Sequence, residues 1–175
     1  MPSDTVLYQA AALCLAHPDE ALLARLPLVR EAAPQLREFT DLAAVAPMPE
    51  LAAHYARLFP PDGSGGVPYS NLYLSRWPGD GATGPFADRA PDGTGSLLPY
   101  AALYRRHGLE LAGVEPPDFL PAVLECAART GDTGPLTGHR VGLERLRVRL
   151  TALGTPYACV VAAVCAALPV GAGQP

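Results

Sequence analysis

Apolar residues recur every three to four positions along most of this chain, which is the spacing of a helix with one buried face. No stretch alternates apolar and polar residues for long enough to compete as a strand. The segments with helical spacing are residues 5–16, 19–25, 28–42 (interrupted near Pro34), 50–59, 97–107, 119–128, 138–153 and 157–168. We therefore expect an all-α protein, a single globular domain over residues 1–175 with about seven to eight helices.

Capping residues and helix stoppers mark several ends of these helices. Asp19 is suited to cap the second helix, because its carboxylate can accept the unpaired N–H groups of a first turn. Pro27 is expected to open the third helix. Gly108 and Gly154 can stop the helices before them in the left-handed conformation, and Thr155 is expected to cap the last helix.

Residues rich in Gly, Pro, Asp and Thr separate the helical segments. The longest such stretch, residues 78–95, predicts a long mid-chain loop that is flexible or functional. Residues 129–137 are expected to form another loop, and residues 169–175 a short flexible tail. The aromatic segment 69–77 is too short to assign.

The segment 115–128 joins two helices through an acidic elbow. Its two adjacent prolines cannot continue a helix, because each lacks an N–H group and restricts the residue before it. Asp118 is expected to cap the helix that follows, with Pro121 in its first turn. That helix carries one apolar stripe: Phe119, Leu120, Val123, Leu124 and Ala127.

Composition and charge exclude several classes of function. The chain has 175 residues and a formal net charge of −4, so it lacks the basic balance expected of a nucleic-acid-binding protein. All 13 basic residues are arginine, which excludes a lysine Schiff base and the lysine of a P-loop. No apolar run reaches the roughly 20 residues of a membrane span, and the N-terminus lacks a signal-peptide pattern. We therefore expect a cytoplasmic protein without a membrane span.

No catalytic, metal or cofactor site can be assigned from motifs. The cysteines form no Cys-x-x-Cys pair and lie in apolar helical segments, so we interpret them as small buried side chains: Cys14, Cys126, Cys159 and Cys165. The four histidines lack metal-ligand spacing. A helical enzyme or cofactor-binding protein, with a site that only the fold assembles, remains an alternative, as does a structural subunit of a complex.

Aromatic residues beside the acidic elbow are the main candidate binding feature. Tyr69, Tyr73 and Trp77 lie in a segment without helical pattern, where large rings are less expected as core. A peptide groove uses such rings as anchors, and neighbouring carboxylates attract arginine. The alternative is a folded-over loop that buries the rings, and the residues themselves do not decide between the two.

Several motifs resemble one family. Residues 115–125, Glu-Pro-Pro-Asp-Phe-Leu-Pro-Ala-Val-Leu-Glu, resemble the Glu-x-Pro-Asp-His-Leu-Pro-x-x-Leu-Glu signature of assembly chaperones for molybdenum enzymes, the NarJ group and its TorD and DmsD relatives. Tyr-Ala-Arg-Leu-Phe at 55–59, Pro-Tyr-Ser-Asn-Leu-Tyr-Leu at 68–74, Leu-Tyr-Arg-Arg-His-Gly-Leu-Glu at 103–110 and Thr-Pro-Tyr-Ala at 155–158 are similar to further family motifs in the same order.

The resemblance implies an all-α chaperone without catalytic activity or cofactor of its own. It would bind the N-terminal, often twin-arginine, peptide of the catalytic subunit of a molybdopterin oxidoreductase until cofactor insertion is complete. The peptide-binding residues that it implies are Tyr69, Asn71, Tyr73, Tyr104, Glu115, Pro117, Asp118 and Phe119. A homodimer is left open.

Departures from the family pattern affect the elbow and the client. Phe119 replaces the usual histidine of the family, which removes a titratable donor, and Asn71 replaces a serine. The insert at residues 78–95 matches neither branch of the family. Because motifs of both branches are mixed, nitrate reductase is the first candidate client and another enzyme of the dimethyl-sulfoxide-reductase type is the second.

Overall fold

The computed structural model describes residues 2–61 and 67–170, and within these ranges the chain forms nine α-helices and no β-sheet. The all-α prediction is confirmed. The helices are α1 (Pro2–Leu15), α2 (Glu20–Ala32), α3 (Arg37–Val45), α4 (Met48–Leu58), α5 (Leu98–Arg106), α6 (Leu120–Thr130), α7 (Gly134–Gly138), α8 (Arg140–Ala152) and α9 (Tyr157–Ala167).

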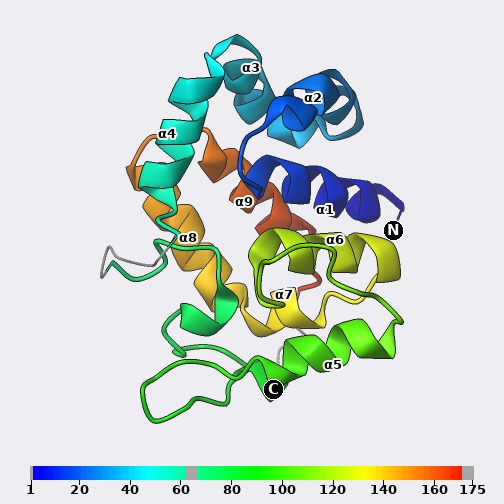
Figure 1. The fold of residues 1–175 in the computed structure, drawn as a ribbon, viewed down its shortest axis with the longest axis vertical. Coiled ribbons are helices and arrows are strands. Elements are labelled where there is room, and N and C mark those ends of the chain that lie inside the picture. The colour runs from blue at the N-terminus through cyan, green and yellow to red at the C-terminus, as the bar shows by residue number, and fades with distance from the viewer. Residues whose placement is uncertain (1, 62–66, 171–175) are drawn as a thin grey trace.

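The core lies around α1, α6 and α9. α1 packs along α6 and also contacts α9, while α8 lies against α9 from the other side (Figure 1). α9 is apolar all round, as a helix surrounded by neighbours should be. The inner face predicted for it is buried: Tyr157, Val160, Val161, Val164 and Leu168. Among the cysteines, Cys14, Cys126 and Cys165 are buried and Cys159 is partly exposed.

Tertiary packing moves several of the predicted helix ends. Asp19 does cap α2, because its Oδ1 accepts the N–H of Leu22 at 2.8 Å. The helix then continues through Pro27, which was expected to start a new one. Proline inside a helix costs about 3 kcal/mol. Burial of Leu26 and Val29, one on each side of the proline, contributes about 1.5–3 kcal/mol each and outweighs that cost.

Two further predictions are corrected near the C-terminal half. Residues 129–137 are not one loop: α6 runs to Thr130, Gly131 turns with a φ of 75°, and the short helix α7 follows. Thr155 does not form a strong cap on α9. Its Oγ1 lies 2.8 Å from Nε2 of His54 and receives the N–H of Tyr157 only at 3.4 Å.

The mid-chain loop, residues 78–95, is irregular as expected, but it is anchored to the core. Phe86 packs against the rings of Tyr100 and His139 at centroid distances of 5.1 and 5.7 Å. Arg89 Nη1 donates to the carbonyl oxygens of Ser75 and Trp77 at 2.9 and 3.0 Å. The loop is largely solvated, as expected, but these contacts tether it to the core. Most of the predicted tail, residues 171–175, lies outside the described part of the chain.

Candidate functional site

A groove runs between α1, α6 and the irregular segment that follows α5. We call that segment, residues 109–115, the strap; in Figure 1 it passes from the end of α5 over the face of α6. The groove has a volume of about 350 Å³. Its lining is Gln9, Ala12, Leu13 and Ala16 from α1, Tyr104 from α5, Leu109–Gly113 and Glu115 from the strap, and Phe119, Pro121, Ala122, Glu125, Cys126 and Arg129 around α6.

Carboxylates outnumber cations along the groove. Glu110, Glu115 and Glu125 line it, against the single guanidinium of Arg129. Glu125 and Arg129 form an exposed ion pair at 3.0 Å. Glu115 accepts a hydrogen bond from the hydroxyl of Tyr73 at 2.9 Å. An apolar trough with a net negative rim suits a ligand that carries both apolar and positively charged groups.

The acidic elbow is joined to the segment before the long loop by a short stretch of antiparallel pairing. The N–H of Leu74 donates to the carbonyl of Asp118 at 3.1 Å, and the N–H of Leu120 donates to the carbonyl of Leu72 at 2.7 Å. Between them Tyr73 and Phe119 face each other, with ring centroids 5.4 Å apart. The pairing places the Tyr73 hydroxyl where it can hold Glu115.

Asp118 does not cap α6, contrary to the prediction. The residue at the N-cap position is Phe119, and no side chain bonds to the first turn. The carboxylate of Asp118, whose residue is 1% exposed, turns the other way and accepts both the N–H and the hydroxyl of Ser75, at 3.0 and 2.6 Å. A buried carboxylate needs such donors. The peptide-binding role expected for Asp118 therefore cannot involve direct contact with a ligand in this conformation.

Tyr69, Asn71 and Trp77 are core residues and not exposed anchors. Tyr69 and Trp77 are buried with their rings 5.6 Å apart, so the folded-over alternative is correct for these two rings. The buried side chain of Asn71 accepts the N–H of Tyr73 at 2.9 Å. These residues shape the segment that presents Tyr73, but they do not line the groove.

Of the other expected site residues, Tyr104, Glu115 and Phe119 line the groove, whereas Tyr73 and Pro117 do not. Tyr73 bonds Glu115 from outside the groove. Tyr104 donates its hydroxyl to the carbonyl of Pro117 at 3.2 Å and so fixes the elbow. Burial, together with the bond to Glu115, raises the pKa of Tyr73 to about 12, and burial also raises the pKa of Tyr104 above its ordinary value. Both phenols therefore stay protonated and act as donors at neutral pH.

Sequence reasoning missed several lining residues. Glu110, Glu125 and Arg129 were not selected, nor was Leu13 of α1. Glu125 and Arg129 lie one turn apart on the polar face of α6, which was available as a signal in the sequence. The contribution of α1 left no such signal in the sequence, because it depends on the packing of α1 against α6.

In the described ranges, no cluster of three or more His, Cys, Asp or Glu side chains could hold a metal ion. In those same ranges, none of the helices combines the length and the apolarity that crossing a membrane requires. The fold and the groove together define the class: an all-α protein with an acidic groove between two helices and a strap.

Comparison with known proteins identifies the family. Residues 25–162 match the model of the nitrate reductase delta subunit family, and the chain belongs to that family. The resemblance drawn from the sequence motifs is thereby confirmed. A solved structure from Archaeoglobus fulgidus, proposed to be a redox enzyme maturation protein, shares the fold with a TM-score of 0.67 and 21% identity, over 95% of this chain and 92% of that one.

Curated relatives match over a shorter region. The chain is 36% identical over 99 residues to the nitrate reductase-like protein NarX of Mycobacterium tuberculosis, in both strain CDC 1551 / Oshkosh and strain H37Rv. That match covers 55% of this chain and only 14% of the length of NarX.

Proposed function

We propose that this protein is a maturation chaperone, without catalytic activity of its own, for the catalytic subunit of a molybdopterin oxidoreductase. It binds the N-terminal peptide of that subunit in the groove and holds the subunit in the cytoplasm until the molybdenum cofactor is inserted. The observation that carries the proposal is the groove between α1, α6 and the strap, because it combines an apolar floor with three carboxylates.

The chemistry of the groove fits a basic, partly apolar peptide. Leu13, Leu109 and Phe119 offer apolar contact, while Glu110 and Glu115 of the strap offer carboxylates. A guanidinium forms charge-assisted hydrogen bonds with carboxylates of this kind. A peptide with arginines beside apolar side chains therefore has a complementary partner for each of its two parts.

Nitrate reductase is the first candidate client. Membership of the nitrate reductase delta subunit family and the similarity to NarX both support this choice. Another enzyme of the dimethyl-sulfoxide-reductase type is the second candidate, since the motifs at 68–74 resemble that branch.

A helical enzyme is the less favoured function. Such an enzyme would place its buried ionisable groups around a pocket, but the buried Asp118 and His139 are not among the residues that line the groove. Asp118 is engaged by Ser75, and Nε2 of His139 lies 2.5 Å from the hydroxyl of Tyr100.

Calorimetric titration tests the proposal with synthetic peptides. We expect the N-terminal peptide of the nitrate reductase catalytic subunit from the same genome to bind, and a scrambled peptide not to bind. Glu115→Gln and Glu110→Gln should each weaken binding by about 1 kcal/mol, roughly fivefold, because each removes a charge-assisted hydrogen bond. Binding should also weaken with added salt, since the groove is open to solvent.

Glu31→Gln is the matched control, because Glu31 is exposed on α2 and does not line the groove. It should leave the affinity unchanged. The peptide of another molybdopterin oxidoreductase, tested in parallel, decides between the two clients. Failure of all these peptides to bind the folded wild-type protein would falsify the proposal.

A further inference from the structure

The strap depends on its two ends for its position. At its start the N–H of Leu109 donates to the carbonyl of Tyr104 at 2.9 Å, and at its finish Glu115 receives the Tyr73 hydroxyl. In between, the described part of the chain provides no backbone hydrogen bond to residues 110–114. Val114 is fully exposed. A segment with so few internal contacts is held by whatever fixes its ends.

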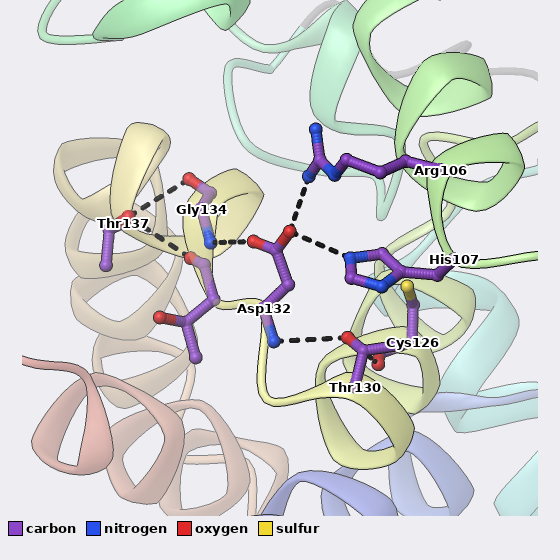
Figure 2. A network of polar contacts seen from close by, with 8 residues as sticks. Arg106, His107, Cys126, Thr130, Asp132, Gly134 and Thr137 are labelled. Atoms are coloured by element: carbon purple, nitrogen blue, oxygen red, sulfur yellow. Dashed lines mark hydrogen bonds and ion pairs between the residues drawn. The ribbon is translucent and has the colours of Figure 1, made fainter.

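One carboxylate fixes the helix from which the strap starts. Figure 2 shows Asp132, in the turn between α6 and α7, reaching the last residues of α5. Its Oδ2 lies 2.5 Å from Nη2 of Arg106 and 3.1 Å from Nε2 of His107. Gly108, directly before the strap, follows and turns with a φ of 64°. The strap therefore leaves α5 at the point where Asp132 holds it.

The carboxylate is itself held in place by the end of α6. The N–H of Asp132 donates to Oγ1 of Thr130 at 3.1 Å, and that hydroxyl donates to the carbonyl of Cys126 at 2.8 Å. Its Oδ1 accepts the N–H of Gly134 at 3.0 Å. Burial alone would raise the pKa of Asp132, but the bonds from His107, Gly134 and Arg106 lower it, so the group is charged at neutral pH.

We propose that Asp132 is a positioning residue of the groove. It ties the end of α5, where the strap begins, to the end of α6, which forms the opposite wall, and so fixes the width of the groove at that end. At the other end the strap is held by the hydrogen bond from the Tyr73 hydroxyl to Glu115. This inference rests on the proposed function, since the width of the groove matters only if the groove binds a ligand.

The contacts of Asp132 distinguish it from an ordinary surface ion pair. Its side chain is 23% exposed and meets three donors from two elements. The Arg30–Asp41 pair between α2 and α3 has a single contact at 2.7 Å and both side chains 52% exposed. Exposed pairs of that kind contribute little, whereas a partly buried carboxylate with several donors restricts the groups that it contacts.

Two variants and two readouts test the proposal in the full chain. Asp132→Ala removes all three contacts. The double variant Arg106→Ala with His107→Ala removes the connection to α5 but keeps the bond to Gly134. It therefore distinguishes loss of the contact with α5 from unfolding of α7. In both variants, amide NMR relaxation of residues 109–114 should report lower order parameters than in the wild type. The nitrate reductase peptide defined above should bind about tenfold more weakly, because ordering the backbone of even one loosened residue opposes binding by about that factor.

Asp41→Ala is the matched control, and it should change neither the order parameters of the strap nor the affinity. Unchanged order parameters in the folded Asp132→Ala and double variants would overturn the inference. So would a loosened strap that binds the peptide as tightly as the wild type. If the wild type does not bind the peptide, the proposed function fails, and with it the claim that Asp132 sets the width of a binding groove. The relaxation data then still show whether Asp132 restrains the strap.

Discussion

The loop 78–95 and the strap 109–115 are both irregular and largely exposed, yet the structure holds them in opposite ways. The loop is anchored along its length, by Asp80 on Arg145, by Phe86 on the core and by Arg89 on two carbonyl oxygens. The strap is fixed only near its ends. The loop has the composition more typical of a flexible segment, so tertiary contacts, and not composition, decide which of the two segments is more firmly anchored.

The difference follows from the side chains that each segment directs inward. In the loop, Phe86 and Arg89 reach buried partners, and Tyr69 donates its hydroxyl to Asp80 at 3.1 Å. In the strap, Leu109 is the side chain that packs against the core, while Leu111 and Val114 face solvent. Ligand-binding segments are drawn from the less stable part of a fold, so the weak anchoring of the strap is compatible with the proposed function.

The largest expected effect is a loss of folding stability at acidic pH through His139, the ring on which Phe86 of the loop packs. Burial, and then the nearby Arg89, lowers the pKa of His139 from 6.5 to about 4. Between those two pH values the unfolded chain binds a proton that the folded chain does not. The stability that neutral His139 provides is therefore complete above about pH 6.5 and falls by roughly 3 kcal/mol as the pH drops toward 4.

Urea denaturation at a series of pH values measures this loss. His139→Gln should flatten the curve between pH 4 and 6.5 even if it lowers stability overall. A smaller slope should remain from His54, whose pKa burial also lowers. An unchanged slope in the variant would contradict the assignment.

Two glycine substitutions should affect the two regions with opposite sign. A Cβ on Gly142 of α8 would lie 2.5 Å from Cε3 of the buried Trp77, at the base of the loop. Overpacking of this kind costs about 1–3 kcal/mol, more than the roughly 1 kcal/mol that alanine gains in a helix. A Cβ on Gly113 of the strap meets nothing nearer than 3.9 Å. Alanine there should be neutral or stabilise by about 0.4–1 kcal/mol through the unfolded state.

Thermal unfolding of Gly142→Ala and Gly113→Ala, compared with the wild type, checks both signs. Equal effects of the two substitutions would mean that the base of the loop is no more tightly packed than the strap.

The smallest expected effect concerns the ion pairs of the two regions. Arg129→Gln frees Glu125 in the groove, so a basic peptide should bind about twofold more tightly, by about 0.3–0.5 kcal/mol. The same change at Arg145, which pairs with Asp80 of the loop at 2.7 Å, should leave the affinity unchanged. Titration calorimetry with the nitrate reductase peptide compares the two variants, and equal affinities would contradict the assignment of Glu125 to the groove.

Much of the candidate site could be predicted because the motifs lie in one continuous stretch. Glu115 and Phe119 of the elbow line the groove as expected. The role of Asp118 could not be predicted, because an aspartate before a helix is a good cap unless a nearer donor competes for it. The donor here, Ser75, is 43 residues away in sequence.

The sequence by itself determined the helices, the acidic elbow and the family, because helical periodicity, capping signals and family motifs are local properties. Tertiary structure alone decided that Pro27 lies inside a helix, that Tyr69 and Trp77 are core, that Asp118 bonds Ser75 and that Asp132 bonds Arg106. Each of these outcomes depends on burial or on a partner far away along the chain. Contacts of that kind leave no local pattern to read.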